Sequence, residues 1–332
     1  MRVLHVSGPA RGGIARHIEQ LCGGLSPAGV EGRLVSVVVS PASLLSLTRE
    51  IRRGRWDLVH CHGFQGGAVG RTAAALAGVP AILTIHNTLQ ISAPARLGAK
   101  VTEKWLAGRT ARWVAVSAYL RNYARQELGV PPEKVETILN GVDFPPEIPP
   151  RQERPVLGTV ARLIPAKGVD VFLRAVQLLR PEIPELKALV VGEGPEGARL
   201  RTMSRDLGLE NIVEFLGYRE DVAEQLGRMA VFVLPTRSEG LGISVLEAMA
   251  RGVPVIASAV GGVPELVRHQ VTGLLVRPGE YGAIARGARR LLADREGAET
   301  LRKNAYREVA ANFSARAMLE QTAATYRRVL HA

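Results

Sequence analysis

A chain of 332 residues, of which 46% are hydrophobic, is long enough for two domains with packed cores, and this composition excludes a disordered or fibrous protein. No apolar run reaches the length of a membrane span or of a secretory signal, so we expect an intracellular, cytoplasmic protein. The two cysteines, Cys22 and Cys61, are too few for a disulfide framework and lack the paired spacing of a zinc site. The net charge of +12 is uneven, because residues 1–144 carry 17 basic against 9 acidic side chains. Such a basic half could attract phosphate-bearing substrates, anionic lipid or nucleic acid.

Short β-branched runs alternate with longer helix-compatible stretches along the whole chain, which is typical of a parallel sheet with helices on both faces. The strands predicted in the first half span residues 3–7, 34–39, 58–60, 81–86, 113–117 and 135–139. Those predicted in the second half span residues 156–160, 186–191, 212–216, 231–235, 255–258 and 274–276. The repeated rhythm predicts two doubly wound α/β domains.

A polar stretch over residues 140–155 separates the two halves and contains five prolines, which prevent a continuous helix or strand. We therefore expect an N-terminal domain over residues 1–145 and a C-terminal domain over 146–312. A final helix over 313–332 could pack back across the linker. Open α/β sheets bind ligands outside the carboxyl ends of their strands, so two facing sheets would place a ligand in the crevice between them.

A glycine-rich turn, GPARGG, follows the first strand and contains Gly12 and Gly13 ahead of a helix that begins near Ile14. Glycines allow close approach of the backbone to a phosphate, and the helix N-terminus supplies free amides and a favourable dipole. The spacing is not GxGxxG, so an ordinary strand-to-helix turn is an equal alternative.

The second half begins with a similar turn between a strand and a helix, and this turn carries basic side chains. Arg162 and Lys167 follow the strand at 156–160, and two cations at the carboxyl end of a strand suit a diphosphate leaving group. Taken alone, such a pair is more often solvated surface.

The segment TRSEGLGISVLEAMA carries the most information in the chain. Glu239 follows a strand, and Glu247 lies about two turns along the next helix. Between them, backbone amides gather at the start of that helix, contributed by Gly240, Leu241 and Gly242. Carboxylates accept hydrogen bonds from vicinal hydroxyls and free amides bind phosphate, so a sugar, a diphosphate and a ribose would satisfy the array in order. Either glutamate alone could instead be a helix-dipole residue.

Glu239 and Glu247 have the spacing of the E-x7-E signature, and in this the chain resembles the retaining glycosyltransferases of family 4. Other motifs follow in the family's order: TIHN at 84–87, NGVD at 140–143, ARLIPAKG at 161–168, VVGEGP at 190–195, FLGYRED at 215–221 and GLLVRPGE at 273–280. The resemblance implies a GT-B fold, which consists of two facing Rossmann-like domains with an interdomain cleft.

The resemblance also implies roles for individual residues. Arg162 and Lys167 match the basic pair that binds the donor diphosphate and stabilises its charge, and Glu239 matches the carboxylate that contacts the transferred sugar. His86 matches a histidine near the reacting carbon. The remaining donor-binding positions are Gly12 and Gly13 on the same phosphates, Glu193 in VVGEGP, Tyr218 and Arg219 at the base, Gly240, Leu241 and Gly242 as phosphate and sugar caps, and Glu247 on the ribose hydroxyls.

The activity implied is that of a retaining hexosyl- or N-acetylhexosaminyl-transferase. It would move a sugar from a nucleotide-diphosphate-sugar donor to an acceptor sugar, a lipid-linked sugar or a small molecule, for example a precursor of an envelope polysaccharide. No DxD-like carboxylate pair stands beside a donor motif, so we expect neither a divalent metal nor another cofactor.

Two alternatives remain open at this point. A sugar-nucleotide epimerase could use the same two-domain architecture. A non-catalytic protein could use its charge to bind an anionic membrane at the inner face, through a basic segment over residues 96–112 in which Leu97, Val101 and Trp105 recur at helical spacing. An ordinary helix with a solvated basic face would give the same pattern. We expect no nucleic acid partner, since no aromatic-interleaved basic motif is present.

Overall fold

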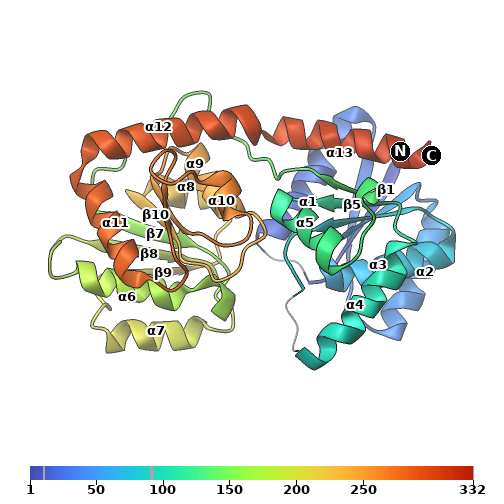
Figure 1. The fold of residues 1–332 in the computed structure, drawn as a ribbon, viewed down its shortest axis with the longest axis horizontal. Coiled ribbons are helices and arrows are strands. Elements are labelled where there is room, and N and C mark those ends of the chain that lie inside the picture. Colours follow the sequence, from blue (N-terminus) through green and yellow to red (C-terminus); the bar gives the residue numbers. More distant parts are fainter. Residues whose placement is uncertain (10–11, 90–92, 332) are drawn as a thin grey trace. The chain divides into compact units, whose positions relative to one another are not determined.

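In this computed structural model the described residues are 1–9, 12–89 and 93–331, without the side chains of 93–97, 99 and 100. They form two compact units (Figure 1). The N-terminal unit consists of Met1–Gly141 together with Ala315–Ala332, and the C-terminal unit of Val142–Ser314.

The N-terminal unit is built on a parallel sheet of six strands in the order β2-β1-β3-β4-β5-β6. The strands are β1 (Arg2–Ser7), β2 (Glu31–Ser36), β3 (Leu58–His62), β4 (Ala81–Ile85), β5 (Arg112–Ala115) and β6 (Val135–Thr137). The helices are α1 (Gly13–Gly24), α2 (Pro41–Gly54), α3 (Gly63–Ala77), α4 (Ala93–Ala107), α5 (Ala118–Glu127) and α13 (Ala315–Leu330), with short 3-10 turns η1 (Ser26–Ala28) and η2 (Pro132–Lys134).

The C-terminal unit has a second six-stranded parallel sheet, in the order β12-β11-β10-β7-β8-β9. Its strands are β7 (Val156–Val160), β8 (Lys187–Val191), β9 (Val213–Gly217), β10 (Val231–Leu234), β11 (Val255–Ser258) and β12 (Leu274–Val276). The helices are α6 (Val169–Leu179), α7 (Gly197–Asp206), α8 (Val222–Gly227), α9 (Ile243–Ala250), α10 (Val263–Leu266), α11 (Tyr281–Ala293) and α12 (Arg295–Asn312), with the 3-10 turn η3 (Pro165–Lys167).

The central strands are buried along nearly their whole length, because helices cover both faces of each sheet and leave no solvated side (Figure 1). Phe172 and Val233 lie in the core of the C-terminal unit, and Leu58 and Ile82 in that of the N-terminal unit. Each predicted strand is present within a few residues of its predicted bounds, and the doubly wound α/β class is confirmed.

The largest shift concerns β2, which was predicted at residues 34–39 and spans Glu31–Ser36. The apolar run that suggested the prediction continues past the strand, and Val38 and Val39 are exposed. β2 is an edge strand, and its register is set by pairing along the whole of β1, from Arg2 opposite Glu31 to Ser7 opposite Ser36. Backbone pairing therefore decides its bounds, and hydrophobicity does not.

The final helix, α13, packs against the N-terminal unit although it follows the C-terminal unit in the chain. Tyr326 is fully buried in the N-terminal core, and Thr325 donates a hydrogen bond to Glu136 of β6 at 2.9 Å. No described helix is both long and apolar enough to cross a bilayer.

Candidate functional site

The sheet of the C-terminal unit reverses its strand order between β7 and β10. From β7 the chain moves to one side through β8 and β9, and it then returns to add β10, β11 and β12 on the other side. The loops that follow β7 and β10 therefore lie next to each other at the carboxyl edge of the sheet. Open α/β sheets bind ligands at such a reversal.

These two loops bring Lys167 and Glu239 together. Lys167 ends the 3-10 turn η3 after β7, and Glu239 lies beyond β10. The Lys167 ammonium donates a hydrogen bond to Glu239 Oε2 at 2.6 Å, and the two side chains are 23% and 15% exposed. The second carboxylate oxygen, Oε1, accepts from the Gly240 amide at 3.2 Å. Two residues that are 72 positions apart thus form one partly buried ion pair.

Arg237 holds the two loops in place, and sequence reasoning missed it. Its guanidinium donates to both carboxylate oxygens of Asp170 at 2.9 and 2.7 Å and to the Pro165 carbonyl at 2.8 Å. Its amide donates to the Ala166 carbonyl at 2.7 Å, and that carbonyl also accepts from the Thr236 hydroxyl at 2.9 Å. The hydrogen bond from Arg237 lowers the pKa of the Asp170 carboxyl, so this clamp stays charged at neutral pH. The one indication of this role in the sequence is the positive charge of Arg237, two positions before Glu239.

Glycines allow the loops to approach each other by their backbones. Gly168 has a φ of +66°, and a Cβ at this position would lie 2.0 Å from the Pro235 carbonyl oxygen. Gly192, after β8, has a φ of +130°, and its Cβ would lie 2.0 Å from the Ala161 carbonyl oxygen. No side chain fits at either distance, and the backbone angles also favour glycine.

The helix α9 begins directly after this ion pair. Gly242 is its N-cap with a φ of +108° and a left-handed backbone, and Leu241 is buried. The cap has no side-chain hydrogen bond, so the first amides of the helix are not covered by a capping side chain. Glu247 is half-buried on the same helix.

The other predicted residues of this unit are more exposed. Arg162 lies in the loop after β7, and no side-chain partner for it is found among the described residues. Glu193 is exposed, and its backbone carbonyl accepts from the Leu163 amide at 2.9 Å, which ties the β8 loop to the β7 loop. The Arg162 guanidinium can therefore reach an incoming anion, whereas the Glu193 carboxylate would repel one.

The residues predicted at the base lie after β9. Tyr218 is 55% exposed, while the Arg219 guanidinium donates to both carboxylate oxygens of Asp221 at 2.7 and 2.6 Å. These hydrogen bonds lower the pKa of the Asp221 carboxyl. Arg219 is therefore already paired within its own loop, and Tyr218 is the more available of the two.

In the N-terminal unit, β1 and β3 are the neighbours at which the strand order reverses. Gly12 is the N-cap of α1, with a φ of +68°, and Gly13 is the first helical residue. A Cβ on Gly12 would meet no atom within 4 Å, so its backbone angle and not crowding accounts for the glycine. The predicted glycine turn thus leads into a helix without a side-chain cap.

His86 follows β4, and it belongs to a buried cluster that sequence reasoning missed. The other members are His5 in β1, His60 and His62 in β3, and His17 in α1. His62 Nε2 lies 3.0 Å from His5 Nδ1, and His62 Nδ1 lies 3.4 Å from His86 Nε2. The signal was a histidine in or just after each of three strands, but the strand order β1-β3-β4 was needed to bring them together.

Burial keeps this histidine cluster neutral. It lowers the pKa of His5 to about 3 and that of His17 to about 4, because desolvation disfavours the imidazolium. The pKa values of His60, His62 and His86 are also well below their usual range for the same reason. At neutral pH each ring can therefore accept a hydrogen bond or bind a metal ion.

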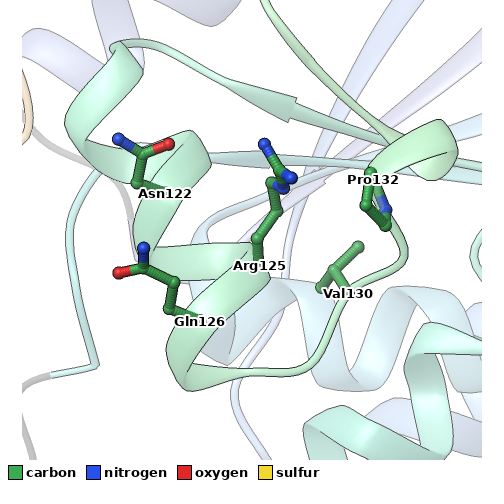
Figure 2. A pocket seen from close by; sticks show the side chains of 5 residues that line it. All are labelled: Asn122, Arg125, Gln126, Val130 and Pro132. Atoms are coloured by element: carbon green, nitrogen blue, oxygen red, sulfur yellow. The ribbon is translucent and has the colours of Figure 1, made fainter.

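A surface pocket of about 300 Å³ lies elsewhere on the N-terminal unit (Figure 2). Asn122, Arg125 and Gln126 of α5 line it together with Val130 and Pro132. None of the predicted site residues lines this pocket, so it has no part in the predicted chemistry.

The basic segment predicted as a membrane-binding alternative falls mainly on α4. Val101 and Trp105 are 62% and 52% exposed, and the Arg109 guanidinium stacks on the Trp105 ring at 3.8 Å. Arg96, Leu97 and Lys100 also belong to this segment, but their side chains lie outside the described part of the structure.

Comparison with known families decides the class of protein. The model of the glycosyl transferases group 1 family matches residues 143–308, and that of glycosyltransferase family 4 matches residues 34–144. The chain belongs to the glycosyl transferases group 1 family. This confirms the resemblance inferred from the E-x7-E signature and its companion motifs.

Individual relatives agree with this assignment. The chain is 30% identical over 283 residues, 79% of its length and 73% of the relative's, to an Escherichia coli enzyme named UDP-Gal:alpha-D-GlcNAc-diphosphoundecaprenol alpha-1,3-galactosyltransferase. Its fold is similar to that of Anabaena HepE, with a TM-score of 0.80, 22% identity and coverage of 99% of this chain and 100% of HepE. The sucrose-phosphate synthase of Thermosynechococcus elongatus gives a TM-score of 0.85 at 24% identity, with 99% of both chains covered. The protein is thus a glycosyltransferase that uses a nucleotide-sugar donor, and neither an epimerase nor a non-catalytic binder.

Proposed function

We propose that this glycosyltransferase moves a hexosyl or N-acetylhexosaminyl group from a UDP-sugar to an acceptor, retaining the anomeric configuration and requiring no divalent metal. UDP is chosen because the E. coli relative is named for UDP-galactose and HepE was crystallised with UDP-glucose. The acceptor we favour is a lipid-linked sugar, the acceptor class in the E. coli relative's name.

The ion pair between Lys167 and Glu239 at the strand reversal is the observation that carries this proposal. The bond between the sugar and the diphosphate breaks with negative charge moving onto the departing phosphate oxygens. Lys167 and Arg162 would stabilise that charge, together with the amides at the start of α9. Glu239 would release the ammonium to the phosphate and accept hydrogen bonds from sugar hydroxyls instead. Before the donor binds, the same pair keeps both charges compensated in a partly buried place.

Retention and metal independence are the second part of the proposal. The acceptor oxygen would attack on the face that the leaving group vacates, through an oxocarbenium-like transition state, and no covalent nucleophile of the protein is involved. Two cations and helix amides would supply the positive charge that a bound metal supplies elsewhere. We expect turnover to persist in excess chelator, and proton NMR of the product to show the anomeric configuration of the donor. Loss of turnover in chelator that added magnesium restores would refute the metal-free mechanism.

Alanine substitution of the two cations tests the proposal directly. Lys167→Ala and Arg162→Ala should each lower turnover by about 100- to 1,000-fold, which is the usual cost of removing a charge-stabilising donor. Lys303→Ala is the matched control, because Lys303 is an exposed lysine of the same unit that pairs with Glu299 on its own helix. The assay is release of nucleoside diphosphate in the presence of acceptor. Near-normal turnover in both active-site variants would reject the assigned roles.

The donor nucleotide can be identified by thermal shift. A ligand at about 100 times its dissociation constant stabilises the folded state by about 2.7 kcal/mol. We expect UDP to raise the melting temperature of the native protein, and GDP and ADP to raise it less. A larger shift with GDP would change the donor and leave the fold and class intact, since one relative is named as GDP-mannose-dependent.

We also propose peripheral contact with an anionic membrane, which would bring the enzyme to a lipid-linked acceptor. The exposed Trp105 and Val101 on α4, beside Arg109, favour this contact because the apolar groups can enter the headgroup region while cations meet anionic lipid. Flotation with vesicles containing phosphatidylglycerol should be salt-sensitive and weaker for Trp105→Ala. Leu178→Ala, which removes an exposed apolar residue of α6, is the control. Equal flotation of all three proteins would exclude α4 as the contact.

A further inference from the structure

Five of the seven histidines of the chain lie in one buried cluster in the N-terminal unit, although the predicted activity uses only His86. Within the cluster, two sets of three could each offer nitrogen atoms within 4.8 Å of one another. One set is His17, His62 and His86, and the other is His5, His60 and His62. The hydrogen bonds around each ring distinguish between them.

His60 is committed to other partners. Its Nδ1 lies 2.7 Å from the Tyr326 hydroxyl, and its Nε2 lies 2.7 Å from the Thr84 hydroxyl. Both ring nitrogens are therefore used, and His60 could bind an ion only by losing a short hydrogen bond. The set that contains His60 is the weaker candidate.

The set that contains His17 has suitable spacing, and the one contact that an ion would replace is the long one between His62 and His86. His62 Nδ1 and His86 Nε2 are 3.4 Å apart, and two nitrogens that bind one tetrahedral ion at about 2.0–2.1 Å lie about that far apart. The His17 ring lies edge-on to both, with centroids 5.8 Å from His62 and 5.0 Å from His86. His17 is only 7% exposed, and within the described residues its Nδ1 has no hydrogen-bond partner.

His5 can support the proposed site as a hydrogen-bond acceptor for His62. If His62 binds an ion through Nδ1, its proton is on Nε2, and this N–H can donate to His5 Nδ1 at 3.0 Å. Histidines that bind metals usually donate their second N–H to an acceptor in this way, which fixes the tautomer and the orientation of the ring.

We propose that His17, His62 and His86 form a binding site for a divalent transition-metal ion of the zinc type. Three neutral imidazoles suit Zn²⁺, Co²⁺, Ni²⁺ or Cu²⁺, and they do not suit Mg²⁺ or Ca²⁺, which prefer oxygen ligands. Three protein ligands leave a fourth position open to water. The ion enters past His17 and His86, the two most exposed members of the cluster at 7% each. No metal ion is proposed on the donor phosphates.

Metal binding would also inhibit the enzyme, a consequence that rests on the proposed function. An ion held by His86 removes that ring from the reacting carbon. Zinc should therefore lower turnover of the wild-type enzyme, and it should have less effect on His17→Gln relative to that variant's own metal-free rate. If zinc binds but does not inhibit, the site stands and the role proposed for His86 falls.

The direct test is metal binding by the untagged full chain after chelator treatment. Equilibrium dialysis against Zn²⁺, with metal content measured by mass spectrometry, should give one bound ion per chain. The Co²⁺ form should show the intense visible absorption of a tetrahedral site. His17→Gln and His62→Gln should each weaken binding by at least about 100-fold, and His5→Leu by about 10- to 100-fold through loss of the acceptor behind His62.

Two further variants control the result. His60→Gln, which lies in the cluster but not in the proposed set, and His331→Gln, at the exposed C-terminus, should keep the bound ion. If His62→Gln does not fold, His17→Gln carries the test, because His17 lies at the margin of the cluster. No more zinc in the wild type than in His17→Gln, or loss of zinc in His60→Gln with retention in His17→Gln, would overturn the proposed ligand set.

Discussion

Acidification from pH 7 to pH 5 should destabilise the N-terminal unit through its buried histidines. An unfolded histidine has a pKa of 6.5 and binds a proton at pH 5, whereas folding lowers the pKa of His5 to about 3 and that of His17 to about 4. The unfolded state therefore binds more protons in this window, and the free energy of unfolding falls as the pH drops below 6.5. Each histidine stops contributing to this fall once the pH is below its pKa in the folded state.

The magnitude follows from the size of the window. One pKa unit corresponds to about 1.4 kcal/mol, so the step from 6.5 to 5 costs about 2 kcal/mol for each imidazole that stays neutral in the folded state. His5 and His17 together give about 4 kcal/mol, a large part of the 5–15 kcal/mol that is typical of a folded domain. The three remaining members of the cluster act in the same direction.

Tryptophan fluorescence during urea unfolding is a suitable measurement, since Trp56, Trp105 and Trp113 are the three tryptophans of the chain and all lie in the N-terminal unit. The loss between pH 7 and pH 5 should be smaller by about 2 kcal/mol in His17→Gln than in the wild type. His331→Gln, with its substitution outside the cluster, should behave as the wild type does. Titrating carboxylates contribute equally to all three proteins, so an equal pH dependence in His17→Gln and the wild type would refute the reasoning.

Three further substitutions test the packing that positions the two candidate sites. Gly168→Ala should destabilise the C-terminal unit by at least about 2 kcal/mol in a urea titration followed by circular dichroism, because its Cβ would meet the Pro235 carbonyl at 2.0 Å and the backbone is left-handed; wild-type stability would contradict this. Arg71→Met should lower the free energy of unfolding, measured by tryptophan fluorescence, by about 3–5 kcal/mol, because the Glu103 carboxylate that accepts two hydrogen bonds from Arg71 at 2.7 Å would remain buried without its cation. The double variant with Glu103→Leu should recover part of that loss. Tyr326→Phe should cost about 1–3 kcal/mol by the same probe, because one imidazole nitrogen of the cluster loses its partner; an unchanged urea midpoint would show that this hydrogen bond contributes nothing.

The sequence was sufficient for the fold because its strand signals are local. Runs such as residues 156–160 and 255–258 combine β-branched side chains with burial on both faces, and their bounds were predicted without error. The edge strand β2 was misplaced because its exposed residues carry little hydrophobic signal. Lys167 and Glu239 were both predicted to bind the donor, and the adjacency of β7 and β10 shows that they also form an ion pair with each other.

What could not be predicted depends on strand order and on backbone contact. Arg237 looks like an ordinary exposed cation in the sequence, and its role appears only when the loop after β10 lies against η3. The histidine cluster is similar, since His5, His60 and His86 are far apart in the chain and meet because β3 lies between β1 and β4. Linear spacing gives no measure of such contacts.

Stability alone does not account for the histidine cluster. Aliphatic side chains of similar volume would fill the same space without losing hydration, whereas a buried polar atom without a partner costs about 1–3 kcal/mol. Within the described residues, His5 Nε2 and His17 Nδ1 have no hydrogen-bond partner, so the cluster carries this cost at least twice. The ion pair of the C-terminal unit differs, because each of its charges is compensated by the other. A bound ion would satisfy the His17 ring and hold His62 in the tautomer that donates to His5. Metal binding would remove the cost that folding leaves on His17, and this distinguishes the cluster from a merely buried group of polar residues.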